Sequence, residues 1–193
     1  MDGKLQLLLD GLYAQGQAVD SAEPDRLRRR RNLEPDSARL LTLILRASRA
    51  RDVVEIGTSN GYSAIWLADA VRPGGGSVTS VDVEISPDAR LNLERAGLAE
   101  LVQLCRADGG SYLAGLPDNS VDLLFLDAER TEYPGWWPHP RRVLRIGGVL
   151  AVDNVLSHPG EVAEFLTLVN GDGGAFSGTT VAVGKGLFLA LRT

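Results

Sequence analysis

The sequence is poor in cysteine, in long apolar runs and in surplus positive charge, and each shortage narrows the possible functions. The single cysteine, Cys105, excludes an intramolecular disulfide and favours a cytoplasmic compartment. No apolar run approaches the roughly 20 residues that span a bilayer, and the N-terminus lacks the apolar core and cleavage site of a signal peptide. The formal net charge of −5 argues against a nucleic-acid-binding protein, whose phosphate contacts call for a basic surface. We therefore expect a cytoplasmic protein that binds neither nucleic acid nor membrane.

The composition is that of a globular domain, with 44% hydrophobic and 23% charged residues. The 193 residues suit one domain with a full hydrophobic core. We expect an N-terminal helix and a connector over residues 1–33, and the core of the domain over residues 34–193.

The first 33 residues divide into an apolar helix and a charged connector. Leucines at positions 5, 8, 9 and 12 share one helical face and predict a helix over residues 4–18. Residues 20–33 are polar and include the run Arg28-Arg29-Arg30-Arg31. We interpret this run as a solvated face or a flexible connector. The alternative is a contact for an anionic substrate or for a partner subunit.

From Pro35 onward, strand-like and helix-like segments alternate. Pro35 suits a first helical position and predicts a helix that ends near Ala50. The expected strands are Val53–Ile56, Val78–Val83, Leu101–Leu104, Val121–Leu126, Val149–Val152, Thr179–Val183 and Leu187–Leu191. The expected helices between them are Ala64–Val71, Pro87–Ala96, Trp136–Arg145 and Glu161–Val169. This alternation predicts an α/β fold with a mostly parallel sheet, covered on both faces, that ends in an antiparallel hairpin.

The turn after the first expected strand reads Gly57-Thr58-Ser59-Asn60-Gly61-Tyr62-Ser63. Gly57 and Gly61 let the backbone approach a ligand closely, and the next helix offers free N–H groups. The glycine spacing differs from that of dinucleotide-binding turns, and the Lys-Ser/Thr ending of a P-loop is missing. Glu55, just before the first glycine, suits a ligand that carries a cation, such as S-adenosylmethionine. The alternative is a tight turn that binds nothing.

Acidic residues follow the second and third expected strands. Asp82 ends the second strand at about the distance from the glycine turn at which a carboxylate binds ribose hydroxyls. Glu84 would face the same side of an extended chain, so both candidates stay open, and we favour Asp82. Asp108, after the third strand, is placed to face an adenine base, with a plain loop or a helix cap as the alternative.

Oxygen-bearing side chains also end the fourth and fifth expected strands. Asp127 follows the fourth strand, and Asp153-Asn154 follow the fifth. Carboxylate and amide oxygens suit a hard divalent cation such as Mg²⁺ or Ca²⁺. Because these motifs contain no histidine or cysteine, we do not expect zinc. The alternative is that the two aspartates cap loops or orient the backbone.

Together, these motifs resemble those of the cation-dependent O-methyltransferases, the family of catechol O-methyltransferase and caffeoyl-CoA O-methyltransferase, and of its bacterial members most. The resemblance covers residues 34–192. It rests on the segments Val53–Ser63, Ser80–Asp82, Phe125–Arg130, Gly147–Val155 and Val183–Leu187. The first segment is typical of class I methyltransferases in general, whereas the two metal-site segments are more specific.

The resemblance implies a Rossmann-like three-layer sandwich with a seven-stranded, mostly parallel sheet and a C-terminal antiparallel hairpin. It implies Mg²⁺ or a similar ion on Asp127, Asp153 and Asn154, and a homodimer is plausible from the family. The expected cofactor-binding residues around S-adenosylmethionine are Glu55, Gly57, Thr58, Gly61, Tyr62, Ser63, Asp82, Asp108 and Asp127.

One residue departs from the family pattern. The family usually has a lysine three residues after the first metal aspartate, placed to take the proton of the substrate hydroxyl, and this chain has Arg130 there. Arginine stays protonated in proteins, so it suits stabilisation of a phenolate or orientation of a carboxylate rather than base catalysis. Removal of the proton would then depend on acidification of the hydroxyl by the metal, on Glu129, Glu132 or His158 as the base, or on water.

We therefore expect residues 34–193 to form a cofactor-binding catalytic core. It would transfer the methyl group of S-adenosylmethionine to a hydroxyl of a small catechol-like or phenolic acceptor, with a divalent cation and with Asp127 and Arg130 as catalytic residues. Arg130 keeps one alternative open, a metal-independent methyltransferase that acts on nitrogen or oxygen. The short N-terminal region keeps a second open, a non-catalytic module that binds S-adenosylmethionine.

Overall fold

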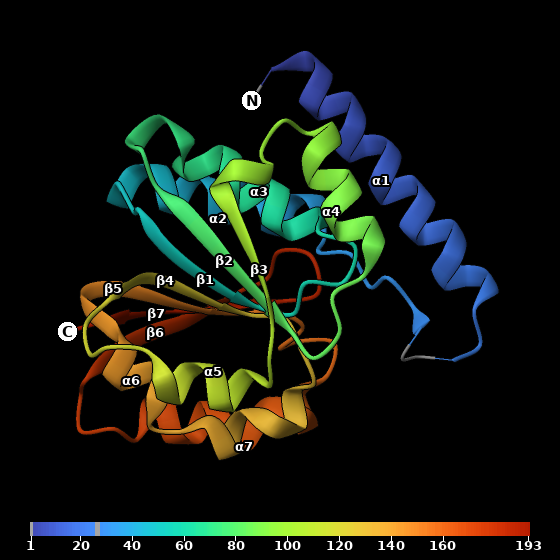
Figure 1. Cartoon of the computed structure of the whole chain (residues 1–193). Coiled ribbons are helices and arrows are strands. Elements are labelled where there is room, and N and C mark those ends of the chain that lie inside the picture. The colour runs from blue at the N-terminus through green and yellow to red at the C-terminus, as the bar shows by residue number, and fades with distance from the viewer. Residues whose placement is uncertain (1, 26–27) are drawn as a thin grey trace.

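The computed structural model describes residues 2–25 and 28–193, whose elements form three layers (Figure 1). Within these residues the strands make one seven-stranded sheet in the order β3-β2-β1-β4-β5-β7-β6. The strands are β1 (Asp52–Ile56), β2 (Ser77–Asp82), β3 (Val102–Arg106), β4 (Val121–Leu126), β5 (Leu144–Val152), β6 (Phe176–Val181) and β7 (Leu187–Arg192). Strands β1 to β5 pair in parallel, whereas β7 is antiparallel to both of its neighbours. The predicted Rossmann-like sheet and its C-terminal hairpin are confirmed.

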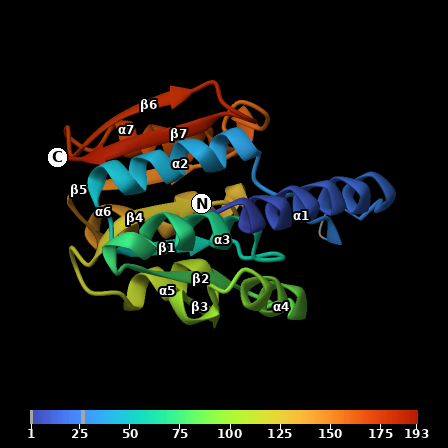
Figure 2. The same cartoon turned by 90° about the horizontal axis from the view of Figure 1, so that it is seen from above.

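Helices cover both faces of the sheet (Figures 1 and 2). One face carries α1 (Gly3–Ala22), α2 (Pro35–Ser48), α3 (Tyr62–Val71) and α4 (Pro87–Arg95), and the other carries α5 (Gly109–Gly115), α6 (His139–Val143) and α7 (Pro159–Asn170). Short 3-10 helices are η2 (Arg72–Gly74), η3 (Ala99–Leu101) and η4 (Arg130–Trp136). No helix within the described ranges is long and apolar enough to cross a membrane.

Each face of the sheet has its own apolar core. Strand β4 is buried along its whole length. Leu123 and Phe125 belong to the core under α2 and α3, whereas Leu124 and Leu126 belong to the core on the side of α7. A central strand with helices on both sides needs apolar residues on both of its faces, which explains why this segment is an almost continuous apolar run in the sequence.

Helix α1 packs on the body through one side and extends past the sheet (Figure 2). Leu5, Leu9 and Leu12 are buried on its inner side, as the leucine spacing predicts. The side chain of Asp2 caps the helix by accepting from the N–H of Leu5 at 2.8 Å. The helix continues to Ala22, so the predicted end at residue 18 is wrong. Residues 26 and 27 of the predicted connector, and residue 1, lie outside the described residues.

The segment after η4 differs most from the sequence prediction. The pattern predicts one helix over Trp136–Arg145, whereas α6 is only five residues long and the chain is already strand β5 from Leu144. Prolines at positions 138 and 140 explain the short helix, because proline lacks an N–H group and fits only the first turn. The prediction also omits α5, whose glycines at 109 and 110 disfavour a helix.

Asp122 joins the starts of three strands. Its side chain is 2% exposed. Its Oδ2 accepts from the N–H groups of Arg51 and Asp52 at 2.5 and 3.1 Å, and its Oδ1 pairs with Arg145 of β5 at 2.5 Å. A buried carboxylate is tolerated only when such donors surround it, so Asp122 stabilises the amino end of the sheet through these three partners.

We predict that Asp122→Ala lowers the free energy of unfolding by about 3 kcal/mol, because two backbone donors and one guanidinium lose their acceptor. Urea denaturation measures the change. Asp36→Ala is the control, because Asp36 pairs with Arg39 on the surface with its side chain 72% exposed, and should cost at most about 0.5 kcal/mol. Equal losses in the two variants would contradict the role given to Asp122.

Candidate active site

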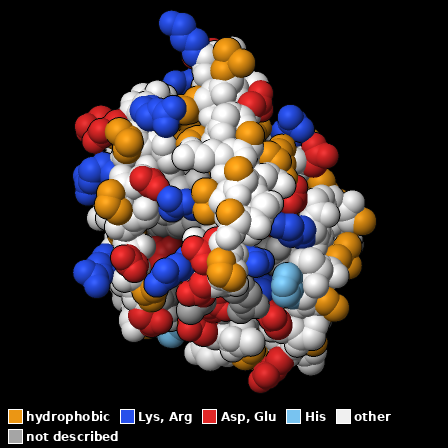
Figure 3. All heavy atoms as spheres, turned by 90° about the vertical axis from the view of Figure 1, so that its right-hand side faces the viewer, with side chains coloured by type: hydrophobic (Ala, Val, Ile, Leu, Met, Phe, Trp, Pro, Cys, Tyr) orange, Lys and Arg blue, Asp and Glu red, His pale blue; other side chains and the backbone are white. Residues whose placement is uncertain are grey.

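The carboxyl ends of the parallel strands open into one large cavity. It has a volume of about 1210 Å³ and is lined by the turn after β1, the end of β2, the loops after β4 and β5, and the connector after α1. On this side of the molecule, acidic and basic side chains lie close together (Figure 3). In open α/β sheets, ligands bind at this edge.

Backbone hydrogen bonds align the first residues beyond three strands in a row. The N–H of Gly57 donates to β2 at 2.8 Å, that of Asp127 to the last carbonyl of β1 at 2.9 Å, and that of Asp153 to the last carbonyl of β4 at 3.1 Å. Gly57 therefore lies beside Asp127, and Asp127 beside Asp153. This row brings the predicted cofactor turn and the predicted metal ligands together.

The glycine turn depends on two close backbone approaches. Gly57 has a φ of +112°, and a Cβ there would lie closer than 3.0 Å to the carbonyl oxygen of Asp127, a separation that real Cβ atoms essentially never show. Gly61 has a φ of +80°, and a Cβ there would lie 3.2 Å from the carbonyl oxygen of Ala89 in α4. Both positions therefore require glycine.

The side chain of Asp82 binds the glycine turn itself. Its Oδ2 accepts from the N–H groups of Thr58 and Ser59 at 2.9 and 3.2 Å. Its Oδ1 accepts from the N–H of Glu84 at 3.3 Å. Glu84 also lines the cavity, and it is exposed. The acid that we favour for the ribose thus organises the turn, while the second candidate is exposed at the cavity.

Glu55 is fully buried beside the turn. Its Oε2 accepts from the hydroxyl of Ser80 at 2.5 Å, and its Oε1 has no hydrogen-bond partner among the described residues. Burial raises the pKa of this carboxyl to about 8. A buried carboxylate oxygen that lacks a donor suits a cationic ligand.

The remaining predicted cofactor residues divide into two groups. Tyr62 and Ser63 line the cavity from the first turn of α3. Asp108 does not line it. Its side chain accepts from the N–H of Ser111 at 2.8 Å, and this bond lowers the pKa of Asp108. The helix-cap alternative for Asp108 is therefore confirmed, its contact with adenine stays a prediction, and the neighbouring Gly109 lines the cavity.

Asp127, Asp153 and Asn154 meet at the edge of the cavity. The Nδ2 of Asn154 donates to the Oδ1 of Asp127 at 3.1 Å, and both residues line the cavity. Asp153 is 2% exposed, and its Oδ1 has no hydrogen-bond partner within the described ranges. Burial raises the pKa of Asp127 to about 6 and the pKa of Asp153 to about 8, and the negative charge of Asp127 adds to the second shift.

This set of oxygens fits a hard divalent cation. In the described part of the chain, no group of three or more His, Cys, Asp or Glu side chains is arranged to hold a metal ion. The candidate set instead has two carboxylates and one amide. Two buried carboxylates repel each other, and a shared cation removes that repulsion. The amide of Asn154 would turn its oxygen toward such an ion.

Arg130 is held beside Asp127 by an acid from α7. It is 4% exposed, and its Nε and Nη2 lie 2.9 and 2.7 Å from the Oε2 of Glu161. The phenolic oxygen of Tyr133 accepts from the N–H of Ala128 at 2.8 Å and donates to the carbonyl of the same residue at 3.2 Å. These bonds fix the loop after β4, so the charge of Arg130 has a defined position in the site.

The connector after α1 is joined to both sides of the cavity. Arg30 pairs with Asp88 of α4, and Arg31 pairs with Glu129 of the loop after β4, with 3.0 Å between Nη1 and Oε1. The interpretation of the arginine run as a solvated connector holds for Arg28, whose side chain is 75% exposed. It is wrong for Arg30 and Arg31, which attach the connector to the core. The pattern of charges alone does not show this, because their partners are distant in the sequence.

The tip of the β6–β7 hairpin also lines the cavity, and sequence reasoning missed its lysine. Lys185 pairs with Glu34 at 3.3 Å. Its carbonyl accepts from the N–H groups of Leu156 and Ser157, both at 3.1 Å, so the tip is bonded to the loop after Asn154. The signal in the sequence was the glycine on either side of Lys185.

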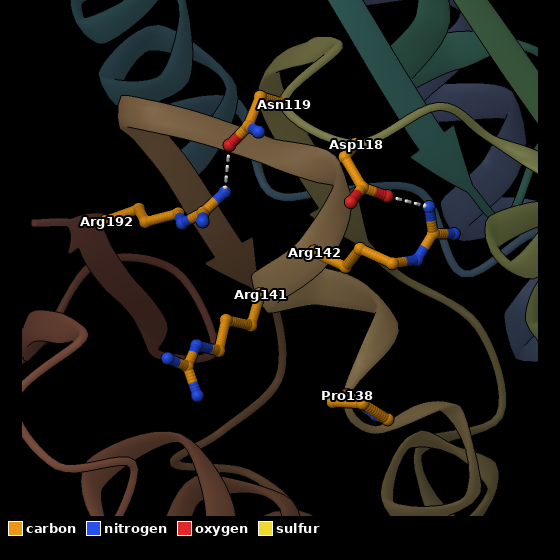
Figure 4. A pocket seen from close by; sticks show the side chains of 6 residues that line it. All are labelled: Asp118, Asn119, Pro138, Arg141, Arg142 and Arg192. Atoms are coloured by element: carbon orange, nitrogen blue, oxygen red, sulfur yellow. Dashed lines mark hydrogen bonds and ion pairs between the residues drawn. The ribbon is translucent and has the colours of Figure 1, made fainter.

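A smaller hollow of about 290 Å³ lies at the opposite ends of the parallel strands, beside the loop before β4 (Figure 4). Its arginines bind protein groups. Arg142 donates to Asp118 at 2.6 Å and to carbonyls at the end of α5, and Arg192 donates to the side chain of Asn119 at 2.7 Å. These bonds attach α6 to the end of α5 and to the loop before β4, and β7 to the same loop, so we assign this hollow a structural role.

Comparison with sequence families and curated proteins gives consistent matches. A family model described as O-methyltransferase matches residues 24–167, which is more than half of the chain. A catechol O-methyltransferase of Mycobacterium tuberculosis is 36% identical over 151 residues, which cover 76% of this chain and 66% of that protein. A catechol O-methyltransferase of Niastella koreensis is 30% identical over 129 residues, which cover 65% and 58%. The chain thus spans 66% and 58% of the lengths of these two relatives, less than two thirds of either.

Two solved O-methyltransferases have the same fold. TomG of Streptomyces achromogenes, in complex with SAM, is 27% identical with a TM-score of 0.78, over 100% of this chain and 91% of that one. An O-methyltransferase of Bacillus cereus, in complex with SAH, is 25% identical with a TM-score of 0.77, over 100% and 92%. The matches extend over the whole chain, so the Rossmann-like methyltransferase architecture is shown.

We predict that Gly57→Ala lowers the free energy of unfolding by about 3 kcal/mol, because the new Cβ combines an unfavourable positive φ with a collision against the backbone of Asp127. Gly75→Ala is the matched control, since Gly75 also has a positive φ but no atom within 4 Å of the added Cβ, and it should cost about 1 kcal/mol. Urea denaturation of both variants separates the cost of the collision from the cost of placing alanine at a positive φ. The close approach would be disproved by equal losses.

Proposed function

We propose, because this chain belongs to the O-methyltransferase family, that it transfers a methyl group from S-adenosylmethionine to a hydroxyl of a small catechol-like or phenolic acceptor, with the help of a divalent cation. The observation that carries the proposal is that Asp127, Asn154 and the glycine turn line one cavity, with Asp153 buried beside them. Related structures in complex with SAM and SAH support the choice of cofactor.

S-adenosylmethionine would occupy the half of the cavity at the ends of β1 and β2. There the turn from Gly57 to Ser63 would follow its methionine part, with the first N–H groups of α3 near the carboxylate. Glu55 would meet its ammonium group, and the added positive charge would lower the raised pKa of Glu55 and keep the carboxyl ionised. This is the chemistry for which a buried carboxylate with an unpaired oxygen is suited.

We assign the ribose hydroxyls to Glu84 rather than to Asp82. One oxygen of Asp82 already accepts from two N–H groups of the turn, and the other accepts from the N–H of Glu84. Glu84 follows in the same loop with an exposed side chain at the cavity. In this assignment Asp82 shapes the turn and Glu84 binds the cofactor.

We predict that Glu84→Gln weakens the binding of S-adenosylmethionine about 10-fold or more, because ribose hydroxyls bind a charged acceptor more strongly than an amide. Its free energy of unfolding should stay unchanged. Asp82→Asn should instead lower the free energy of unfolding by about 1 kcal/mol or more, because the turn N–H groups lose a charged acceptor. Calorimetric titration and urea denaturation measure both quantities, and a reversed pattern would return the ribose to Asp82.

The cation would be held by Asp127, Asp153 and Asn154. Bound there, it would lower the pKa of the acceptor hydroxyl, so that the oxygen becomes a nucleophile near neutral pH. Asp153 contributes an oxygen that lacks a donor among the described residues. The two buried carboxylates supply the negative charge that a divalent ion requires.

The main contribution of the protein itself is orientation. The acceptor oxygen attacks the methyl carbon as the bond from that carbon to sulfur breaks, so the two must be held in line at about 3 to 3.5 Å. Arg130, fixed by Glu161, keeps a positive charge beside Asp127 and would stabilise the oxygen anion, but it cannot accept the proton. The hydroxyl proton would leave to solvent or to an acceptor that lines the cavity, such as His158.

We predict that the chelator-treated protein methylates a catechol at least about 100-fold more slowly than the protein with Mg²⁺. Asp153→Asn should lose both metal binding, measured by calorimetry, and activity, because the amide removes one negative charge from the side chains that would hold the ion. Asp36→Asn, at an acid that is 72% exposed and does not line the cavity, is the control and should keep both. Methyl transfer at full rate after chelation would disprove the role of the metal. It would favour the metal-independent alternative, which Arg130 motivates.

A further inference from the structure

Arg31 is distinguished among the cavity residues by its backbone. Its φ of +48° is uncommon for a residue with a long side chain. The two carboxylate oxygens of Asp20, in α1, hold this conformation by accepting from the N–H groups of Arg30 and Arg31 at 2.6 and 2.9 Å. The carbonyl of Arg30 accepts from the hydroxyl of Ser59 at 2.9 Å. The connector is therefore fixed to α1 on one side and to the glycine turn on the other.

This backbone directs the side chain of Arg31 to the half of the cavity that the acceptor would occupy. Its Nη1 lies 3.0 Å from Glu129, two residues after Asp127, and its side chain is 38% exposed. The guanidinium therefore lies beside the loop that follows Asp127, and Arg31 and Asp127 line the same cavity.

Arg31 also keeps donors for a ligand. A guanidinium has five N–H donors in a planar fork, and among the described residues the Arg31 side chain forms one hydrogen bond, to Glu129. The other basic groups around Asp127 are each paired with one acid as well, Arg130 with Glu161 and Lys185 with Glu34. Arg130 uses two of its nitrogens on Glu161 and its side chain is 5% exposed, whereas Arg31 uses one nitrogen on Glu129 and its side chain is 38% exposed. Of the two arginines beside Asp127, Arg31 is thus the one that keeps exposed donors for an anion on the acceptor.

We propose that the acceptor carries an anionic group, a carboxylate or a phosphate, which binds the guanidinium of Arg31 while the acceptor hydroxyl lies at Asp127. A guanidinium fork matches both groups, since two oxygens of the anion can accept two parallel N–H bonds. The inference rests on the proposed function, because it takes the hydroxyl end of the acceptor from that proposal. It adds a specificity determinant at the opposite end of the acceptor.

The test is a charge series on one catechol. The acceptors are 3,4-dihydroxybenzoate, the neutral 3,4-dihydroxybenzamide and the cationic 3,4-dihydroxybenzylamine, with a catechol that carries a phosphate monoester as the fourth. We expect kcat/KM to fall from anion to neutral to cation. The benzoate and the phosphate ester, compared with each other, distinguish the two sources of negative charge.

Variants at position 31 then locate the charge preference. Arg31→Asn should lower kcat/KM for the anionic acceptors about 10- to 100-fold, as expected for a lost charge-assisted bond, while changing it less than about threefold for the benzamide. Asparagine tolerates the left-handed backbone, so the connector should keep its conformation. Arg31→Lys should restore part of the preference. Arg39→Gln, at a side chain 57% exposed on α2, is the matched control and should change nothing.

The outcomes separate the two proposals. Methylation of all four catechols without a charge preference, or a preference that survives Arg31→Asn, overturns this inference and leaves the proposed function intact. Failure to methylate any of them, with S-adenosylmethionine still bound in calorimetry, overturns the proposed acceptor class and this inference with it. If Arg31→Asn loses cofactor affinity as well, the kcat/KM values of Arg31→Lys decide between the two roles. An equal loss of kcat/KM for the anionic and the neutral acceptors means that Arg31 only holds the connector, which overturns this inference.

Discussion

The site depends on one constraint, the backbone hydrogen bonds that connect each strand end to the first residue beyond its neighbour. Because the N–H groups of Gly57, Asp127 and Asp153 bond to the adjacent strands at 2.8 to 3.1 Å, residues far apart in the sequence share one row. The row leaves no space between the glycine turn and the carbonyl of Asp127. A cofactor on the turn and a cation on the aspartates would therefore be neighbours, which is the arrangement that methyl transfer requires.

Acidic and basic residues that are far apart in the sequence lie close together around this row. Asp127 and Asp153 are buried and repel each other, and arginines and a lysine from the connector, η4 and the hairpin surround them. Each of these cations is paired with an acid from yet another element, so the arrangement is held by several ion pairs rather than by one. Such sites carry a cost in stability that the apolar cores on both faces of the sheet offset.

The fold was predictable because its signals are local. The apolar run Val121–Leu126 and the glycine turn are readable from spacing, and the strand ends predict where Asp127 and Asp153 lie. The helix predicted over Trp136–Arg145 was wrong because two prolines outweighed its periodicity. The position of Arg31 was not predictable, because its partners Asp20 and Glu129 are brought to it by tertiary structure alone. The same holds for Asp82, whose side chain binds the N–H groups of the glycine turn.

The hairpin tip at Lys185 has a consequence for the order in which the site forms during synthesis. The loop after Asn154 is bonded to the carbonyls of Lys185 and Gly186. A nascent chain that has reached only the end of α7 can already pair β1 with β2 and β4 and close the glycine turn. It still lacks the residues that hold the loop beside the aspartates. The half of the site proposed for the cofactor can therefore form on the ribosome before the half proposed for the acceptor does.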